Sequence, residues 1–212
     1  MNIMGNAHDA LEDVVILDLT RVVAGPFCTS MLGDMGARVI KIENPKGGDD
    51  SRAYGPYVNG ESAYFAMHNR SKEGVTLNLK APEGKALFLE MVKKIIYAAV
   101  SGYGCYGRYS QRPGYDILGQ AMGGLMSVTG TKESGPVKAG NAMGDMLGGL
   151  NLTIGILAAL HARTIIGHGQ RVDVSLVDAV VVSLENVFTR YWYSGVVPER
   201  EGNANPATAP YN

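Results

Sequence analysis

The chain has 212 residues, of which 46% are hydrophobic and 18% charged, and its formal net charge is −1. Such a composition is typical of a globular protein with one large domain, and it excludes the strongly basic surface of a nucleic-acid-binding protein. The two cysteines, Cys28 and Cys105, lack metal or disulfide spacing, and residues 1–10 lack the pattern of a signal peptide. We therefore expect a cytoplasmic protein that has no metal site and binds neither nucleic acid nor membranes.

The N-terminal part of the chain has the pattern of a strand, a helix and a second strand. Residues 14–19 are a continuous apolar run, which predicts a strand buried on both faces. Pro26 suits the first turn of a helix through residues 27–35 that ends at Gly36, and residues 38–43 predict the second strand. This order predicts a βαβ unit, and with it an α/β fold: a Rossmann-like open parallel sheet with flanking helices.

The turn after the first strand raises the alternative of a dinucleotide site. Glu43 ends the second strand, as an acidic residue does in dinucleotide-binding domains. However, Ala24-Gly25-Pro26 does not match the glycine pattern G-x-G-x-x-G. The sequence therefore disfavours this alternative.

The middle of the chain contains a junction that lacks a loop. A loop, a short helix, a strand, an amphipathic helix and another strand are expected at residues 44–50, 62–69, 75–79, 81–94 and 95–100. The last helix runs into the following strand at Lys94 and Ile95 without any breaker, although connections in α/β units use a few loop residues. We predict that a segment is missing from the chain between these two residues.

A glycine-aromatic loop at residues 101–107 follows the strand. Open α/β sheets bind ligands at this end of their strands, so the loop is a candidate binding element, with a mobile surface turn as the alternative. Residues 112–117 are expected to lead into a helix that runs through Met122, and a further strand and helix are expected at residues 171–176 and 178–192.

A glycine-rich stretch, residues 140–149, precedes an apolar run that ends at Leu160. Asp145 is the only charged residue between Lys138 and His161. A carboxylate is stabilised at a helix N-terminus, and glycines around it would let a substrate approach closely. The alternative is that Asp145 is only the N-cap of its helix. We expect the apolar run to be a buried helix, too short to span a bilayer.

Taken together, these stretches resemble the family III CoA-transferases. The matching segments, in the order of the chain, are residues 17–26, 31–43, 78–84, 101–104, 112–116, 144–145, 155–160 and 169–173. The resemblance implies that residues 1–212 are the large, Rossmann-like coenzyme A (CoA) binding domain of that fold. It also implies that a CoA-binding loop is missing between residues 94 and 95, and that a small domain and a C-terminal segment are absent. The family further implies an interlocked homodimer.

The resemblance implies a reaction in which CoA moves from an acyl-CoA thioester to a free carboxylic acid. Asp145 would be the nucleophile and would form first an anhydride and then an aspartyl-CoA thioester. Gly148 and Gly149 are candidate oxyanion donors at the helix start, and Tyr115 supports the site from its loop. No permanently bound cofactor is implied, because CoA and acyl-CoA are substrates.

The resemblance also implies a set of CoA contacts. These are Val22, Val23, Ala24, Leu77, Asn78, Leu79, Lys80, Gly102, Tyr103 and Gly104. Lys41, Lys72 and Lys80 are basic candidates for the CoA phosphates, with the alternative that each is a solvated surface lysine. Val23 and Asn44 stand where formyl-CoA transferase has Gln and Arg, which argues against formyl-CoA and oxalate as substrates.

Two alternatives to CoA transfer stay open from the sequence. The α-methylacyl-CoA racemases share this fold and use a His at the position of Tyr115, but a neutral Tyr with a pKa near 10 is a poor base. The chain could also be a non-catalytic α/β binding module.

Overall fold

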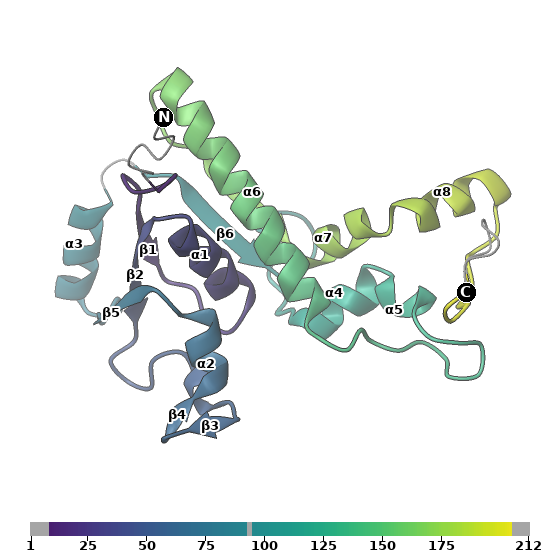
Figure 1. Cartoon of the computed structure of the whole chain (residues 1–212). Helices are drawn as coiled ribbons and strands as arrows, with labels where there is room; N and C mark the ends of the chain where they lie inside the picture. The colour runs from purple at the N-terminus through teal and green to yellow at the C-terminus, as the bar shows by residue number, and fades with distance from the viewer. Residues whose placement is uncertain (1–8, 93–94, 205–212) are drawn as a thin grey trace, which may run out of the picture. The chain divides into compact units, whose positions relative to one another are not determined.

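The computed structural model describes residues 9–92 and 95–204. The chain divides into two compact units. The first unit contains the residues up to Ala98 together with Leu152–Val172, and the second contains Ala99–Asn151 together with the residues from Asp173 onward. Figure 1 labels the helices and strands.

The first unit is built on a three-stranded parallel sheet. Its strands are β1 (Val15–Asp18), β2 (Arg38–Glu43) and β5 (Lys72–Thr76), in the order β1-β2-β5. Helix α1 (Ala24–Asp34) connects β1 to β2 and contacts both strands (Figure 1). The predicted βαβ unit and the α/β fold class are therefore confirmed.

Helix α1 begins and ends close to the predicted positions. It starts at Ala24, so that Pro26 lies in its first turn, and Met35 is its C-cap. Gly36 follows with φ of 101°, and a Cβ atom there would lie 2.2 Å from the Cβ of Asp9. Glycine is required at this position because other residues avoid the left-handed region and the space is filled.

The structure corrects two predictions about this sheet. Val15 is 59% exposed and Leu19 41% exposed, so the prediction that the first strand is buried on both faces is wrong. The reason is its edge position, since β1 pairs with β2 alone within the described residues. Strand β5 begins at Lys72 instead of residue 75, because Lys72 pairs with Val39 of β2.

The remaining elements of the first unit follow the predicted order. They are η1 (Asp50–Ala53), β3 (Tyr57–Val58), β4 (Glu61–Ser62), α2 (Ala63–His68) and α3 (Pro82–Met91). Ser62 caps α2, because its hydroxyl accepts a hydrogen bond from the Phe65 N–H at 3.0 Å. The sequence predicts a missing segment between residues 94 and 95. Residues 93–94 lie outside the described residues, so the missing segment stays a prediction.

The second unit combines part of a strand pair with several helices. Strands β6 (Tyr97–Ser101) and β7 (Arg171–Ser175) pair with each other, and the boundary between the units crosses both. The helices are α4 (Asp116–Met122), α5 (Leu125–Val128), α7 (Leu176–Ser183) and α8 (Glu185–Ser194). The single helix predicted for residues 178–192 is thus two helices.

Glycines on α4 let this helix pack closely against α7. A Cβ atom at Gly119 would lie 3.2 Å from the Leu176 side chain, and one at Gly123 would lie 2.5 Å from the Val180 side chain. Val180 itself is fully buried. The glycines that the sequence places in this helix therefore serve helix packing.

Helix α6 (Met143–Ile166) is longer than the apolar run suggested. It has 24 residues, and it is long and apolar enough to cross a membrane by length and composition alone. The prediction that it is too short to do so is therefore wrong. Only 33% of the most apolar part of the helix is buried, and Ile165 is 74% exposed. Core helices of globular proteins meet the same length criterion, so this finding alone does not assign the helix to a membrane.

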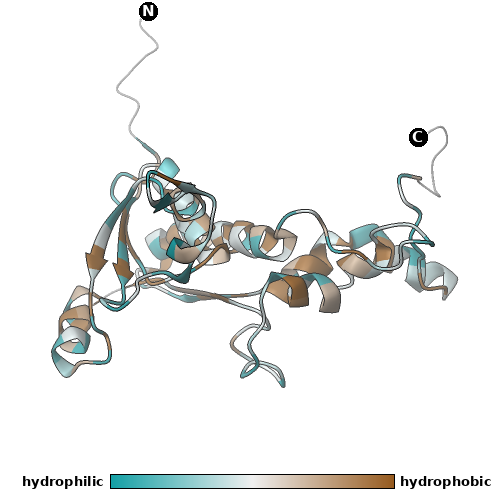
Figure 2. Ribbon diagram, turned by 90° about the horizontal axis from the view of Figure 1, so that it is seen from below, coloured by the Kyte–Doolittle hydropathy of each residue, from teal (hydrophilic) through white to brown (hydrophobic). Residues whose placement is uncertain are grey.

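The buried core of the first unit lies between α1 and the sheet. Cys28 and Leu32 of α1 are fully buried, and Val39 of β2 is 1% exposed. Cys28 has its pKa raised to about 11, chiefly by burial, so it behaves as a core residue and not as a reactive thiol. Figure 2 shows that apolar residues gather in the strands and helices, while the connecting loops are mostly hydrophilic or neutral.

Candidate active site

Asp145 lies in the first turn of α6 without capping the helix. The helix begins at Met143, and the backbone N–H groups of Gly144 and Asp145 donate to Oδ1 of Asp116 at 2.7 and 3.2 Å. The carboxylate that satisfies these helix-start N–H groups therefore comes from α4. The alternative interpretation of Asp145 as an N-cap is wrong. Within the described residues, no hydrogen bond to the Asp145 carboxylate is found.

A buried glutamine holds the segment that leads into α6. Gln120 is fully buried, and its Nε2 donates to Oδ2 of Asp116 at 2.7 Å and to the Asn141 carbonyl at 3.2 Å. Its Oε1 accepts a hydrogen bond from the Ala139 N–H at 2.8 Å. These contacts satisfy the amide that the protein has buried, and they tie α4 to the residues just before Met143.

The surroundings of Asp145 make it harder to ionise than an ordinary aspartate. Burial, as the larger effect, and the nearby Asp116 carboxylate raise the pKa of Asp145 to about 6. At neutral pH the group is still mainly ionised, and its raised pKa makes it a more basic carboxylate. A perturbed carboxylate at a helix start, with no hydrogen bond to its oxygens in the described residues, is a candidate nucleophile.

The predicted oxyanion donors do not lie where the prediction needs them. Gly148 and Gly149 are buried and lie beyond the first turn of α6, where helix N–H groups bond to carbonyls of the preceding turn. A Cβ atom at Gly148 would lie 2.5 Å from Leu176, so this glycine permits close packing. The premise that these N–H groups lie at the helix start is therefore wrong.

The segment before α4 links the glycine-aromatic loop to the start of α6. A Cβ atom at Gly102 would lie 2.6 Å from Gly114, and Gly104 has φ of 76°. Two residues after Gly114 comes Asp116, which bonds to α6, whereas Tyr115 between them is 67% exposed. The second unit thus brings the loop residues, Tyr115 and the Asp145 turn together along one short segment.

Tyr103 lies in the same loop and packs against its surroundings. Its hydroxyl donates to the Met122 sulfur at 3.2 Å, and its ring lies 5.7 Å from that of Tyr109. The loop carbonyl of Gly102 accepts hydrogen bonds from the Val177 N–H and the Ser175 hydroxyl. These contacts make the loop an ordered part of the unit, which disfavours the alternative of a mobile turn.

The first unit carries the other predicted CoA contacts at one edge of its sheet. Val22, Val23 and Ala24 follow β1, and residues 77–80 follow β5. Because β1, β2 and β5 are parallel, both segments lie at the carboxyl end of the sheet, where open α/β sheets bind ligands. The second segment is closely packed, since a Cβ atom at Gly84 would lie 2.2 Å from the Asn78 carbonyl oxygen.

The structure rules out two of the three lysines considered for the CoA phosphates. Lys41 pairs with Asp49 at 2.9 Å and Lys72 pairs with Asp18 at 3.0 Å, and both lysine side chains are 2% exposed. They are neither solvated surface lysines nor available to a phosphate. Lys80 is exposed and stays a candidate.

Asp116, Gln120 and Asp49 are residues that sequence reasoning missed. Asp116 and Gln120 are four residues apart on one helix, so their proximity was readable from the sequence. The segment that they bind was not, because Asn141 lies 21 residues beyond Gln120 and Gly144 lies 28 residues beyond Asp116.

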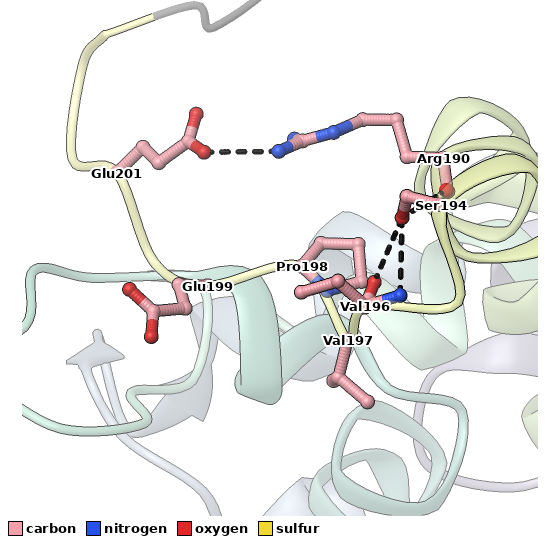
Figure 3. A pocket seen from close by; sticks show the side chains of 7 residues that line it. All are labelled: Arg190, Ser194, Val196, Val197, Pro198, Glu199 and Glu201. Carbon is pink, nitrogen blue, oxygen red and sulfur yellow. Dashed lines mark hydrogen bonds and ion pairs between the residues drawn. The ribbon is translucent and has the colours of Figure 1, made fainter.

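A cavity elsewhere in the second unit holds none of the predicted site residues. It has a volume of about 260 Å³ (Figure 3) and is lined by Arg190, Ser194, Val196, Val197, Pro198, Glu199 and Glu201. Arg190 and Glu201 form an ion pair at 3.0 Å across it. Among the described residues, no group of three or more His, Cys, Asp or Glu side chains is placed to hold a metal ion.

Comparison with known proteins identifies the family. The pattern of CoA-transferase family III matches residues 11–95 and 90–212. An acetyl-CoA:oxalate CoA-transferase from Acetobacter aceti is 38% identical, over 95% of this chain and 59% of that protein. A succinyl-CoA:glutarate CoA-transferase from Mus musculus is also 38% identical, over 95% of this chain and 53% of that protein. The chain belongs to CoA-transferase family III.

Solved structures agree with this assignment. A CAIB/BAIF family protein from Brucella suis is 35% identical and superposes with a TM-score of 0.85, over 93% of this chain and 61% of that one. A hypothetical protein from Mycobacterium tuberculosis is 27% identical, with a TM-score of 0.80, over 96% of this chain and 61% of that one. The chain thus spans about three fifths of the length of these structures and somewhat less of the mouse protein.

Proposed function

We propose that this chain carries the CoA-binding part and the nucleophile of a CoA-transferase that moves CoA from an acyl-CoA thioester to a free carboxylic acid. The observation that carries the proposal is the Asp145 carboxylate. It lies at the start of α6, its helix N–H groups are satisfied by Asp116, and its pKa is raised to about 6. Family membership supports CoA and acyl-CoA as substrates, without a permanently bound cofactor.

The chemistry proceeds through two kinds of covalent intermediate on Asp145. A carboxylate oxygen attacks the thioester carbonyl, the C–S bond breaks, and CoA leaves as a thiolate from the mixed anhydride. The thiolate then attacks the aspartyl carbonyl, which releases the donor acid and leaves an aspartyl-CoA thioester. The acceptor carboxylate reverses these steps: it forms a new anhydride, and CoA thiolate attacks its acyl carbon to give the product thioester and free Asp145.

The segments proposed to contact CoA present mainly backbone groups, and each unit carries some of them. In the first unit these are Val22–Ala24 and residues 77–80, and in the second they are Gly102, Tyr103 and Gly104. Lys80 is the basic residue proposed for a phosphate, because its side chain is exposed at the carboxyl end of the sheet. We include Tyr115 as a residue that lines the approach to Asp145, since it adjoins Asp116 and is exposed.

Several properties of the whole protein belong to this proposal. We propose a homodimer in the cytoplasm, a missing segment between residues 94 and 95, and a further small domain and C-terminal segment. The two matches to the family pattern meet at residues 90–95, which supports the missing segment. The chain covers only 53–62% of the first three curated relatives, which supports the further segments.

The substrates are proposed as a short acyl-CoA donor and a small carboxylic acid. Curated relatives are named for acetyl-CoA with oxalate and for succinyl-CoA with glutarate. Val23 and Asn44 argue against formyl-CoA and oxalate, so these belong in the screen as a direct check. The screen combines CoA thioesters with a panel of carboxylic acids and identifies new thioesters by mass spectrometry. Failure of every acid to accept CoA would overturn the proposed function.

The role of Asp145 is tested with the full-length protein. Asp145→Asn and Asp145→Ala should lower transfer by at least about a thousandfold, since an amide or a methyl group cannot form the anhydride. Hydroxylamine should trap the wild-type intermediate as a hydroxamate on Asp145, located by peptide mass spectrometry. Asp178→Asn is the matched control, because Asp178 also lies in the first turn of a helix in the same unit. Near-normal transfer by Asp145→Asn, or an adduct on another residue, would exclude this nucleophile.

A further inference from the structure

The turn between β1 and α1 has an unusual backbone. Val22 has φ of 68°, in the left-handed region that β-branched residues avoid. Such a conformation persists only where the surroundings impose it, and it is concentrated at functional sites. The turn lies at the carboxyl end of the parallel sheet and leads directly into α1. Contacts from neighbouring residues must therefore impose this backbone shape.

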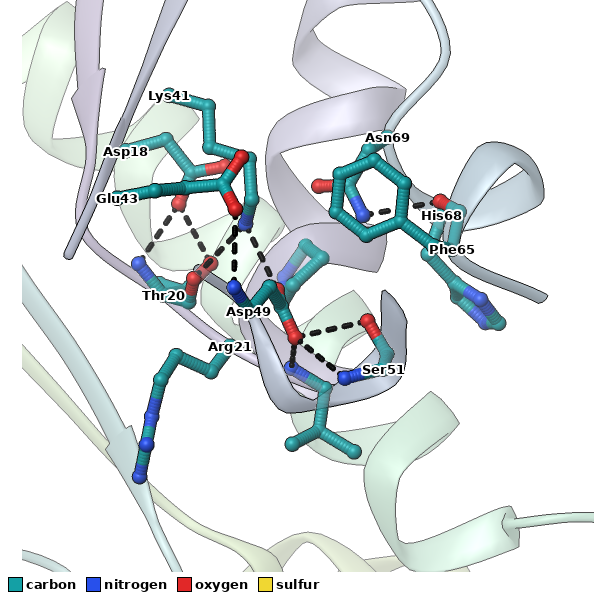
Figure 4. A network of polar contacts seen from close by, with 12 residues as sticks. Asp18, Thr20, Arg21, Lys41, Glu43, Asp49, Ser51, Phe65, His68 and Asn69 are labelled. Carbon is teal, nitrogen blue, oxygen red and sulfur yellow. Dashed lines mark hydrogen bonds and ion pairs between the residues drawn. The ribbon is translucent and has the colours of Figure 1, made fainter. Parts of the chain in front are cut away.

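A single ion pair holds both sides of the turn (Figure 4). Nζ of Lys41 donates to the Thr20 carbonyl at 2.9 Å and lies 2.9 Å from Oδ2 of Asp49. Oδ1 of Asp49 accepts a hydrogen bond from the Val22 N–H at 3.1 Å. The Lys41 cation thus binds the carbonyl of Thr20, two residues before Val22. The Asp49 anion binds the N–H of Val22 itself.

Asp49 is itself held in a fixed orientation. Its Oδ1 also accepts hydrogen bonds from the Ser51 N–H at 2.9 Å and from the Ser51 hydroxyl at 2.7 Å. Its own N–H donates to Oε2 of Glu43 at 2.9 Å, at the end of β2. The loop after β2 therefore carries the acceptor that the turn after β1 needs, and the sheet fixes the spacing between them.

The burial of this pair argues for a positioning role. The Lys41 side chain is 2% exposed and that of Asp49 is fully buried. Removing two charges from water costs so much free energy that well-packed apolar residues are often as stable or more stable. Fold stability alone therefore does not account for the pair, whereas control of a strained turn does.

We propose that Lys41 and Asp49 are positioning residues that hold residues 20–24 in the shape required to bind CoA through the turn backbone. This inference rests on the proposed function, because it assigns CoA as the ligand of the turn. Neither side chain touches the ligand, since both are buried behind the turn. The pair acts on the affinity for CoA and leaves the chemistry at Asp145 unchanged.

The test compares two doubly substituted variants of the full-length protein. Lys41→Met with Asp49→Leu removes both charges and leaves the Val22 N–H without its acceptor. Lys41→Met with Asp49→Asn removes the charges but keeps an oxygen that can accept from Val22. The dissociation constant for CoA should rise at least about tenfold in the first variant and less in the second. The maximal transfer rate at saturating acyl-CoA should stay within about threefold of wild type.

The matched control is Val39→Ala, because Val39 is a buried residue of the same strand whose apolar side chain cannot hydrogen bond to the turn. It should weaken the fold and leave the CoA dissociation constant within about twofold. Hydrogen exchange at the Val22 amide gives a readout without CoA. Exchange should be faster than in wild type in Lys41→Met with Asp49→Leu. It should be slower in Lys41→Met with Asp49→Asn than in that first variant.

The outcomes separate this inference from the proposed function. Unchanged CoA affinity in both double variants, with a wild type that binds CoA and transfers it, would overturn the positioning role alone. A wild-type protein that does not bind CoA would overturn the proposed function and this inference with it. If the first variant does not fold, Asp49→Asn alone decides the question: its CoA dissociation constant should rise at least about threefold, and no change would contradict the inference.

Discussion

The Asp145 carboxylate lies where opposing electrostatic effects meet. Burial and the Asp116 charge disfavour its ionised form, whereas the dipole of α6 favours a negative charge in the first turn. Burial and, to a smaller extent, the Asp116 charge raise the pKa of Asp145 to about 6. The result is a carboxylate that is ionised at neutral pH and more basic than aspartate in water.

This pKa predicts how transfer depends on pH. Asp145 must be ionised to act as the proposed nucleophile, so the rate should be constant well above pH 6 and should fall about tenfold per pH unit well below it. The measurement is the pH profile of the transfer rate at saturating substrates between pH 5 and 8. A profile that stays flat down to pH 5 would show that Asp145 does not titrate as a buried carboxylate.

The same pKa predicts a stability change of defined sign. The folded-state pKa of about 6 exceeds the ordinary aspartate value of 3.8, so the resulting stabilisation is complete below pH 4 and is lost as pH rises through 6. At pH 7 the ionised carboxylate therefore destabilises the fold, and Asp145→Asn should raise the free energy of unfolding by about 1 kcal/mol after screening by solvent and the helix dipole are allowed for.

Thermal unfolding at pH 7 and pH 4 measures this effect. The melting temperature of Asp145→Asn should exceed that of wild type by roughly 2–4 °C at pH 7, and the difference should vanish near pH 4. A loss of transfer together with a gain in stability is the pattern of a catalytic group. A lower melting temperature at pH 7 would instead mean that the Asp145 charge stabilises its helix.

At the scale of elements, the start of α6 is built by another helix. Gln120 and Asp116 of α4 bind the backbone on both sides of residue 142, and Gly119 of this helix and its C-cap Gly123 allow α7 to pack closely. Helix α4 therefore orients the Asp145 turn and anchors it to the second unit. Because the contacts are side chain to backbone, they depend on the side chains of α4 and hardly on those of residues 139–144.

Replacing the buried amide should test this arrangement. Gln120→Leu fills the space but leaves the Ala139 N–H, the Asn141 carbonyl and Oδ2 of Asp116 without that partner. The loss of buried hydrogen bonds should lower the free energy of unfolding by about 2–4 kcal/mol. It should also lower the maximal transfer rate far more than it weakens CoA binding, because the nucleophile is displaced and the CoA contacts are not.

The control for this change is Asn151→Ala on α6. Asn151 also makes a side chain-to-backbone hydrogen bond, to the Leu147 carbonyl at 2.8 Å, but it is exposed. Its removal should change the unfolding free energy by no more than about 0.5 kcal/mol. Equal losses in the two variants, or a Gln120→Leu protein with normal transfer, would contradict the role assigned to Gln120. Chemical denaturation and steady-state kinetics supply both measurements.

At the scale of the whole molecule, each unit carries some of the residues proposed to contact CoA or to react with it. The first unit holds the turn after β1 and residues 77–80, and the second holds Gly102–Gly104 and Asp145. Large aromatic residues are also exposed in the second unit: Trp192 of α8 is 76% exposed and Tyr193 is 91% exposed. Exposed apolar surface of this kind is typical of protein–protein contacts.

The proposed homodimer gives a whole-molecule prediction. The full-length protein should have twice its monomer mass in light scattering coupled to gel filtration, at micromolar concentration. Trp192→Asp with Tyr193→Asp should raise the dimer dissociation constant at least tenfold if α8 lies in the contact, while Tyr106→Asp, on another exposed tyrosine, should not. A monomeric wild-type protein with full transfer activity would contradict the dimer.

Local patterns in the sequence determined the first βαβ unit, the start of the long helix and the family. The apolar runs around Pro26 and Gly36 define the first βαβ unit, because helix and strand periods and turn residues act within a few positions. The glycine-rich stretch around Asp145 marked the start of the long helix, and the collinear motifs identified the family. Each of these signals lies within one short segment, so no knowledge of distant contacts was needed.

Only the tertiary structure decided which residues meet. Lys41 and Lys72 look like surface lysines in the sequence, yet Asp49 and Asp18 pair with them in the interior. The group that caps α6 lies 28 residues before Gly144, and nothing near Asp145 in the sequence reveals it. Pairing of distant strands and burial of charges depend on how separate segments pack together, which local propensity does not encode.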